Sequence, residues 1–166
     1  TQAANIENLI RELKSGKRIP NREQEDNLIF NYDKNDREIN SMEFTVDNYI
    51  ETDNEIIAIE LKSVRPNSGE GKGEKQKILY AKSALKLLHP EKEIKYFVGF
   101  PFDPTSPTAT DFDKERFFDY LIEFKKFFDP GEILIANELW NFLSGKKGTM
   151  DDILEVVKAT VRQVRR

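Results

Sequence analysis

The segment of residues 94–100 constrains the fold more than any other, because its side chains are apolar almost without a break. A strand of this kind is typical of a sheet that is covered on both faces. A helical pattern precedes it over residues 74–88, whose apolar side chains recur three and four positions apart. We expect the buried side of that helix to comprise Ile78, Leu79, Ala81, Leu85 and Leu88. This order predicts an α/β domain with a mixed β-sheet flanked by α-helices.

Other periodic segments agree with an α/β domain. They predict helices over residues 3–14, from 111 or 113 to 128, over 138–143 and from 149 onward, and strands over 43–50, 55–64 and 133–136. Residues 20–40 are polar, and their pattern does not distinguish a helix from a loop. No internal repeat and no linker interrupts the 166 residues, so we expect a single domain over residues 1–166.

Composition excludes several classes of protein. The chain has no Cys and one His, which leaves no disulfide, zinc-thiolate or multi-His metal site and argues against a Ser-His-Asp triad. Hydrolytic chemistry would then rest on carboxylates and Lys. No apolar stretch approaches the roughly 18 residues that cross a bilayer, so we expect a cytoplasmic protein with no membrane partner. The sequence begins with Thr rather than Met, which leaves room for an upstream segment.

A tight turn is predicted between the strands over residues 43–50 and 55–64. Asp53 and Asn54 suit its two central positions, because both residues tolerate a positive φ better than most. If Thr52 faces Glu55, the register follows: Ile50 faces Ile57, Asp47 faces Glu60 and Thr45 faces Lys62. Glu60 and Lys62 share a face because they are two positions apart on one strand. The hairpin would therefore gather polar side chains on one patch of the sheet.

Opposed carboxylates in a sheet repel each other unless a cation lies between them. Lys62 supplies part of that charge, and a divalent Mg²⁺ or Mn²⁺ would supply more, since both ions prefer oxygen ligands. Such an ion can polarise a phosphodiester and activate a water molecule, while Lys62 orients or deprotonates the nucleophile. The alternative is a structural salt bridge between Glu60 and Lys62, which the Glu-x-Lys pattern by itself favours.

Charge is divided along the chain in a way that suits a metal beside a phosphate backbone. Residues 20–60 hold twelve acidic and three basic side chains, whereas residues 61–86 hold seven basic and two acidic ones. An acidic region next to a basic one is what a site for a divalent cation and a nucleic acid needs. Two solvated faces are the alternative interpretation.

The residues around this patch resemble the PD-(D/E)xK nuclease superfamily: Asp47, the apolar strand before Glu60-Leu61-Lys62, and the Lys-rich helix after it. Val46 stands where the superfamily pattern has Pro. Gln76 and Tyr80 resemble the Gln-x-x-x-Tyr motif of several nuclease branches; a solvated Gln76 and a Tyr80 at the core edge are the alternative. The run of residues 59–80 is similar to type II restriction endonucleases of the TdeIII and MjaII type, most sharply over residues 47–88.

This resemblance implies a restriction-endonuclease-like fold and a Mg²⁺-dependent homodimer, with Mn²⁺ able to substitute, that hydrolyses phosphodiester bonds of double-stranded DNA at a short palindromic site. It assigns catalysis to Asp47, Glu60, Lys62 and Gln76, and metal binding to Asp47, Glu60 and Leu61. The basic segment after the site is expected to bind DNA through Arg65, Asn67, Ser68, Lys72, Lys75, Lys82 and Lys86. The last three of these residues are expected to share one helical face.

Two other interpretations stay open. A nuclease of the same fold could act in DNA repair or in mobile elements, and a non-catalytic nucleic-acid-binding module could keep the fold. The intact set of Asp47, Glu60 and Lys62 favours an enzyme, because a binding module has no need of two opposed carboxylates. The glycine-rich loop over residues 69–75 lacks the Gly-x4-Gly-Lys-Ser/Thr spacing, so we expect no nucleotide cofactor.

Overall fold

A four-stranded mixed sheet forms the centre of the protein. The computed structural model describes residues 1–31, 41–65 and 69–164. The strands lie in the order β1 (Asn48–Glu51), β2 (Glu55–Leu61), β3 (Glu93–Phe100) and β4 (Ile133–Ile135). β1 is antiparallel to β2, whereas β2, β3 and β4 are parallel to one another. The predicted α/β class with a mixed sheet is confirmed.

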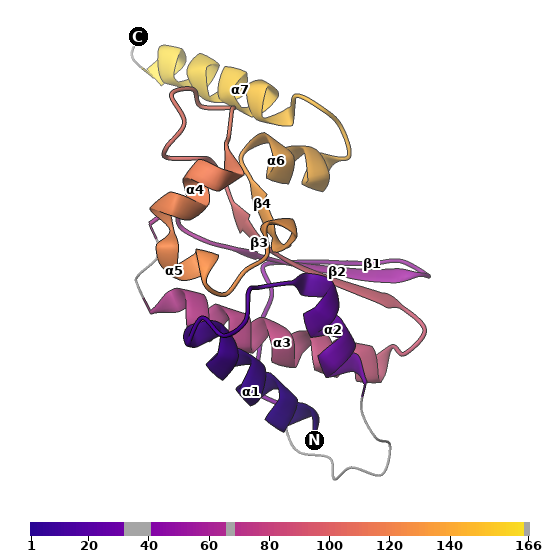
Figure 1. Ribbon diagram of the computed structural model, residues 1–166. Coiled ribbons are helices and arrows are strands. Elements are labelled where there is room, and N and C mark those ends of the chain that lie inside the picture. Colours follow the sequence, from indigo (N-terminus) through magenta and orange to yellow (C-terminus); the bar gives the residue numbers. More distant parts are fainter. Residues whose placement is uncertain (32–40, 66–68, 165–166) are drawn as a thin grey trace.

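Helices cover both faces of this sheet (Figure 1). One side carries α1 (Gln2–Lys14), α2 (Arg22–Phe30) and α3 (Glu70–Leu88), and the other carries α6 (Asn137–Ser144), against which α7 (Thr149–Val164) packs. α4 (Lys114–Tyr120), α5 (Ile122–Lys125) and the 3-10 turn η1 (Pro130–Glu132) lead into β4. No helix of the described segments is long and apolar enough to cross a membrane.

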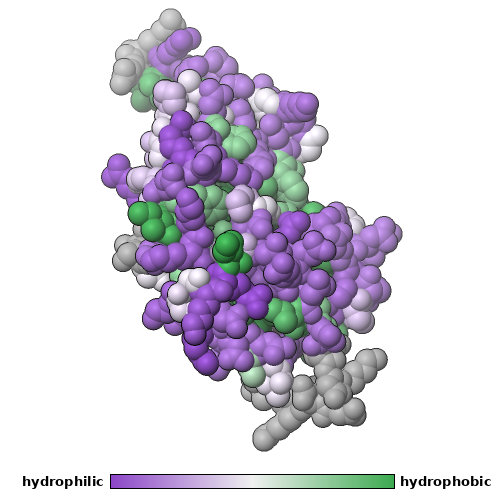
Figure 2. All heavy atoms as spheres, viewed as in Figure 1, coloured by the Kyte–Doolittle hydropathy of each residue, from purple (hydrophilic) through white to green (hydrophobic). Residues whose placement is uncertain are grey.

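Alternate residues of the strands divide the core into two layers. Ala58, Tyr96 and Val98 are buried in the same cluster as apolar side chains of α1 and α3. Ile57, Ile59 and Phe97 point the other way and pack with Leu134 and Leu139. The remaining surface is mostly polar: Figure 2 shows a largely hydrophilic face with small separate apolar patches.

The hairpin register is confirmed where the ladder forms, since Ile50 pairs with Ile57 and Asn48 with Ile59. The turn lies at the predicted position, because the Thr52 amide donates to the Glu55 carbonyl at 2.9 Å, but neither Asp53 nor Asn54 has the positive φ that was expected there. The expected strand over residues 43–50 is too long, however, because pairing begins at Asn48. The expected pairs of Asp47 with Glu60 and of Thr45 with Lys62 are therefore absent from the ladder.

Two helical predictions also need correction. The helix expected up to residue 128 breaks at Leu121 (φ −102°, ψ 60°), and Phe117 and Phe124 on either side of the break both contact Phe100, with ring centroids at 4.9 and 5.6 Å. The second correction concerns Leu88, which was expected on the buried side of the helix over residues 74–88 but is 71% exposed.

α3 also begins earlier than predicted, inside the glycine-rich stretch that the sequence analysis assigned to a loop. Gly71 lies in its first turn, and a Cβ there would come within 2.9 Å of the Glu123 carbonyl oxygen. The missing side chain thus allows the start of α3 to approach α5 closely.

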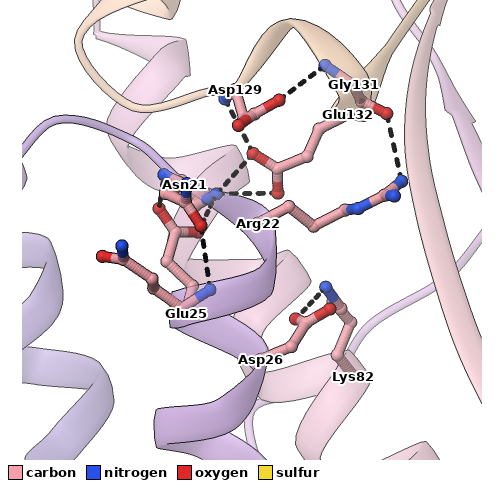
Figure 3. A network of polar contacts seen from close by, with 10 residues as sticks. Asn21, Arg22, Glu25, Asp26, Lys82, Asp129, Gly131 and Glu132 are labelled. Atoms are coloured by element: carbon pink, nitrogen blue, oxygen red, sulfur yellow. Dashed lines mark hydrogen bonds and ion pairs between the residues drawn. The ribbon is translucent and has the colours of Figure 1, made fainter.

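A buried lysine network, which comprises Lys75, Glu25 and Glu132, joins α3 to α2 and η1. The Lys75 ammonium contacts both Glu132 oxygens at 2.7 Å and also the Glu25 carboxylate, and none of the three side chains is more than 2% exposed. Backbone amides complete the arrangement, since Asn21 N donates to Glu25 and Asp129 N donates to Glu132 (Figure 3). Burial acts to lower the pKa of Lys75, but Glu132 and Glu25 outweigh it and raise that pKa.

Replacing Lys75 by Met should destabilise the protein by about 3–5 kcal/mol near neutral pH, because two buried carboxylates lose their cation. Burial already raises the pKa of Glu25 above 4.5, and Glu132 raises it further. A carboxyl with a raised folded pKa stabilises the fold below its unfolded pKa and loses that contribution as the pH rises through the folded value. Lys75→Met should therefore cost less stability at about pH 5 than at about pH 8.

Urea unfolding of both proteins at the two pH values measures this difference. Lys72→Met, at an exposed position of the same helix, is the matched control and should change the free energy of unfolding by less than about 0.5 kcal/mol. An equal cost at both pH values for Lys75→Met would contradict the account.

Candidate active site

The carboxyl end of β2 presents Glu60 and Lys62 to the side of the sheet that α3 covers. Glu60 follows Ile56 and Ala58 on the same face, because alternate residues of a strand share a face. Lys62 lies just beyond the strand, where its amide donates to the Gly99 carbonyl of the β3 side at 2.9 Å. The backbone of Lys62 is therefore fixed by the parallel strand β3 and not by Thr45, the hairpin partner expected from the sequence.

Asp47 reaches the same strand end by a different contact from the one predicted. Its Oδ2 accepts a hydrogen bond from the backbone amide of Leu61 at 2.7 Å. The carboxylate of Asp47 thus lies beside the peptide between Glu60 and Leu61, although the two residues are not a ladder pair. The predicted approach of Asp47 to Glu60-Leu61-Lys62 is met through this hydrogen bond.

Four side chains form an ion-pair cluster at this place: Glu60, Lys62, Glu74 and Lys77. Glu60 Oε1 lies 2.8 Å from Lys77 Nζ and 3.2 Å from Lys62 Nζ. Glu74 Oε1 lies 2.8 Å from Lys62 Nζ, and its Oε2 lies 3.2 Å from Lys77 Nζ. These side chains are only 12–19% exposed, so their charges are partly shielded from solvent. Each ammonium contacts two carboxylates, and each carboxylate contacts two ammonium groups.

The electrostatic environment keeps Lys62 positively charged. Burial acts to lower the pKa of Lys62, but the ion pairs with Glu74 and Glu60 outweigh it and raise that pKa above its usual value. The Lys62 ammonium can therefore supply a fixed positive charge and hydrogen-bond donors to a negatively charged group.

Tyr96 of β3 lies close to the acidic side chains. The residue is 1% exposed, and its hydroxyl has no hydrogen-bond partner. Burial raises the pKa of Tyr96 most, and the charges of Glu60, Glu74 and Asp47 raise it further. Tyr96 is the ladder partner of Ala58, so it shares with Glu60 the face of the sheet that α3 covers.

The donor set of this region fits a magnesium ion that keeps most of its water. Within the described segments, no three Asp, Glu, His or Cys side chains are grouped so that they could hold a metal by themselves. Mg²⁺, however, is commonly bound through one or two carboxylates together with water and phosphate oxygens. Asp47 and Glu60 supply two such carboxylates around the Leu61 peptide, although Glu60 already has two ammonium partners.

Two of the lysines expected to contact DNA do not face solvent. Lys75 is fully buried in the lysine network, and Lys82 is 1% exposed in an ion pair with Asp26 (Figure 3). Lys86 is half-buried: its ammonium donates to the Lys92 carbonyl at 2.7 Å and lies over the Phe30 ring. The prediction of a phosphate-binding face is wrong for Lys75 and Lys82, because they are buried against α2 and the interior, and it stays a prediction for Lys86.

The remaining predicted residues lie on α3 and in the segment before it. Arg65 and Lys72 are exposed, and Asn67 and Ser68 lie outside the described residues. Gln76 is half-buried on α3. Its motif partner Tyr80 packs against the core, where burial raises the pKa of Tyr80 and Glu7 of α1 raises it further. The catalytic role of Gln76 stays a prediction.

Three residues that the structure brings to the site were not expected from the sequence: Glu74, Lys77 and Tyr96. Glu74 and Lys77 are three positions apart on α3, so they share a helix face, and this spacing was visible in the sequence. Tyr96 was recognisable as a polar group inside an apolar strand, and Ala58, two residues before Glu60, is its ladder partner. Without the parallel register, neither signal pointed to Glu60.

Comparison with known proteins decides the family. Residues 1–160 match the family model described as "Type II restriction endonuclease, HinfI". The chain belongs to this HinfI family. The match includes α1 and α2, which lie before the residues 47–88 where the resemblance is sharpest, so these helices are part of the HinfI family domain as well.

A relative in the curated proteins agrees with the HinfI assignment. The chain is 47% identical over 160 residues to "Type II restriction enzyme MjaII" of Methanocaldococcus jannaschii. The aligned part covers 95% of this chain and 43% of that relative, so the chain spans about two fifths of the relative's length. No solved structure matches.

Proposed function

We propose that this protein is a type II restriction endonuclease that hydrolyses phosphodiester bonds of double-stranded DNA at a short palindromic site with Mg²⁺, and that residues 1–166 form its single nuclease domain. The approach of Asp47 to the Glu60-Leu61-Lys62 strand end, in a chain of the HinfI family, is the observation that carries this proposal. Asp47, Glu60 and the backbone of Leu61 would hold the metal, and Mn²⁺ would substitute for Mg²⁺.

The chain's own residues have separate tasks in this reaction. When bound, the metal would polarise the scissile phosphate and lower the pKa of a water molecule. Asp47, fixed by the Leu61 amide, and Glu60, fixed by the strand, orient the donors for the metal. Lys62, held between Glu60 and Glu74, stabilises negative charge and orients the attacking water.

A homodimer follows from the proposed substrate. Cutting both strands of a palindrome requires two active sites related by a two-fold axis, and each chain supplies one set of Asp47, Glu60 and Lys62. The alternatives are a nuclease of repair or mobile elements and a non-catalytic nucleic-acid-binding module.

Incubation of the protein with plasmids of known sequence and Mg²⁺ tests the proposal. Discrete double-strand fragments that share one end sequence support restriction. A smear supports a nonspecific nuclease, and uncut plasmid that is nonetheless bound supports the non-catalytic module. Light scattering with a specific duplex should give a complex that contains two copies of the chain.

Asp47→Asn and Glu60→Gln should each abolish cleavage while leaving DNA binding intact or tighter. Both changes remove a negative charge and a metal ligand and keep the side-chain shape, so phosphates approach the site more easily. Cleavage and gel-shift assays in Mg²⁺ and in Ca²⁺ measure the two properties. Loss of DNA binding in both variants, with the fold intact by circular dichroism, would count against this assignment.

Lys62→Ala should slow cleavage by roughly 100-fold or more, the order expected for loss of a positioned electrostatic group. Single-turnover kinetics at saturating protein isolates the chemical step from DNA binding. A rate near that of the unmodified protein would return Glu60 and Lys62 to the status of a structural salt bridge.

Arg65 and Lys72 are the exposed residues of the basic segment that remain as candidates for phosphate contacts. The double variant Arg65→Ala, Lys72→Ala should lower the magnitude of the slope of log K against log salt by about 0.9 for each contact. Sequence preference should stay the same, since phosphate contacts carry no sequence information. Lys147→Ala, at an exposed position near the start of α7, is the matched control. If only Lys147→Ala changes the slope, the DNA contacts the region near the start of α7 and not Arg65 and Lys72.

A further inference from the structure

Lys77 is a second cation on the carboxylate that the proposed function assigns to the metal. Its Nζ lies 2.8 Å from Glu60 Oε1, closer than the 3.2 Å of Lys62 Nζ from the same oxygen. An ammonium group at this distance takes up both the lone pair and the charge that a metal ion would use. A metal ion and Lys77 therefore compete for Oε1 of Glu60.

The charges near the site are already almost balanced without a metal. Asp47, Glu60 and Glu74 bring three negative charges, and Lys62 and Lys77 bring two positive ones. A divalent cation that enters this site meets a net charge of about −1, whereas removal of Lys77 would leave about −2. The cluster is largely shielded from solvent, and the buried Tyr96 lies close to its carboxylates, so these charges act at close range.

Glu74 is already a second carboxylate partner of the Lys77 ammonium group. Glu74 Oε2 is buried, accepts no hydrogen bond, and lies 3.2 Å from Lys77 Nζ. Lys77 can therefore leave Glu60 and keep a carboxylate partner on its own helix. The displaced ammonium does not have to return to water.

We propose that Lys77 is the counter-ion of Glu60 and that a divalent cation must displace Lys77 from Glu60, leaving it paired with Glu74, so that Lys77 weakens metal binding in the absence of DNA. This inference rests on the metal site of the proposed function. A purely structural Lys77 would instead hold Glu60 in its binding position, and its removal would then weaken metal binding. The two roles predict changes of opposite sign.

Isothermal titration calorimetry with MnCl₂ and no DNA distinguishes the two roles. Lys77→Met should bind Mn²⁺ roughly tenfold more tightly than the unmodified protein, because a competing charge is lost. Lys77→Arg, which keeps the charge, should stay near the original affinity. Lys147→Met removes one exposed lysine elsewhere and controls for the change in net charge.

A thermal melt supplies a second measurement and shows whether each variant is folded. Added Mn²⁺ should raise the Tm of Lys77→Met by more than it raises the Tm of the unmodified protein, since a tighter ligand stabilises the native state more. The double variant Glu60→Gln, Lys77→Met should lose this gain, because Lys77 acts through Glu60. Equal or weaker Mn²⁺ binding by a folded Lys77→Met would overturn the inference.

Failure of the inference and failure of the proposed function give different results. If Asp47→Asn and Glu60→Gln reduce Mn²⁺ binding but Lys77→Met leaves it unchanged, only the role of Lys77 is wrong. If neither the unmodified protein nor Lys77→Met binds Mn²⁺ in the presence or absence of duplex DNA, the metal site and the inference fall together.

Discussion

The ion pairs of Lys75 with Glu25 and Glu132 fix how α3 is rotated about its axis. An ammonium group that is fully enclosed is tolerable only with carboxylate partners, so Lys75 must face α2 and η1. This rotation also fixes the direction of the neighbouring side chains, so that Glu74 and Lys77 face the end of β2. The network lies on another side of α3 from the candidate site, yet it determines which residues of α3 can take part in that site.

α3 thus separates two sets of charges that the sequence shows as one basic segment. One side of the helix carries buried lysines with partners on α2, and the other carries Glu74 and Lys77 beside Glu60 and Lys62. A count of charges along the chain cannot separate these sides. The contacts of Asp47, Glu60 and Lys62 point to the end of β2, whereas the charge count alone pointed to the wrong face of the helix.

The sequence was sufficient for the hairpin because its register depends on local rules. Turn residues at Asp53 and Asn54 and a period of two determine which residues are paired. The apolar strand β3 was equally clear, since its position between two parallel neighbours requires apolar side chains on both faces. The approach of Asp47 was foreseen, but not its contact with the Leu61 amide, because a single side-chain hydrogen bond leaves no periodic signal.

The lysines of α3 show what sequence reasoning could have used and did not. Lys75 and Lys82 lie three or four positions from Ile78 and Leu79, so the helical period that predicted those two as buried also places the lysines on the buried side. Charge was given more weight than periodicity. The partners Glu25, Asp26 and Glu132 lie about 50 residues or more away along the chain, and no local pattern connects them.

The hairpin between β1 and β2 makes the length of its turn a condition for assembling the site. Asp47 lies one residue before the first ladder pair, and its carboxylate must reach the amide of Leu61 at the other end of β2. One residue inserted at 52–54 would shift the register of β1 relative to β2 or force a β-bulge. By contrast, an insertion in the connection between α3 and β3 could be looped out without moving Asp47. The evolutionary tolerance of this chain to length variation should therefore differ sharply between two short loops at the same edge of the sheet.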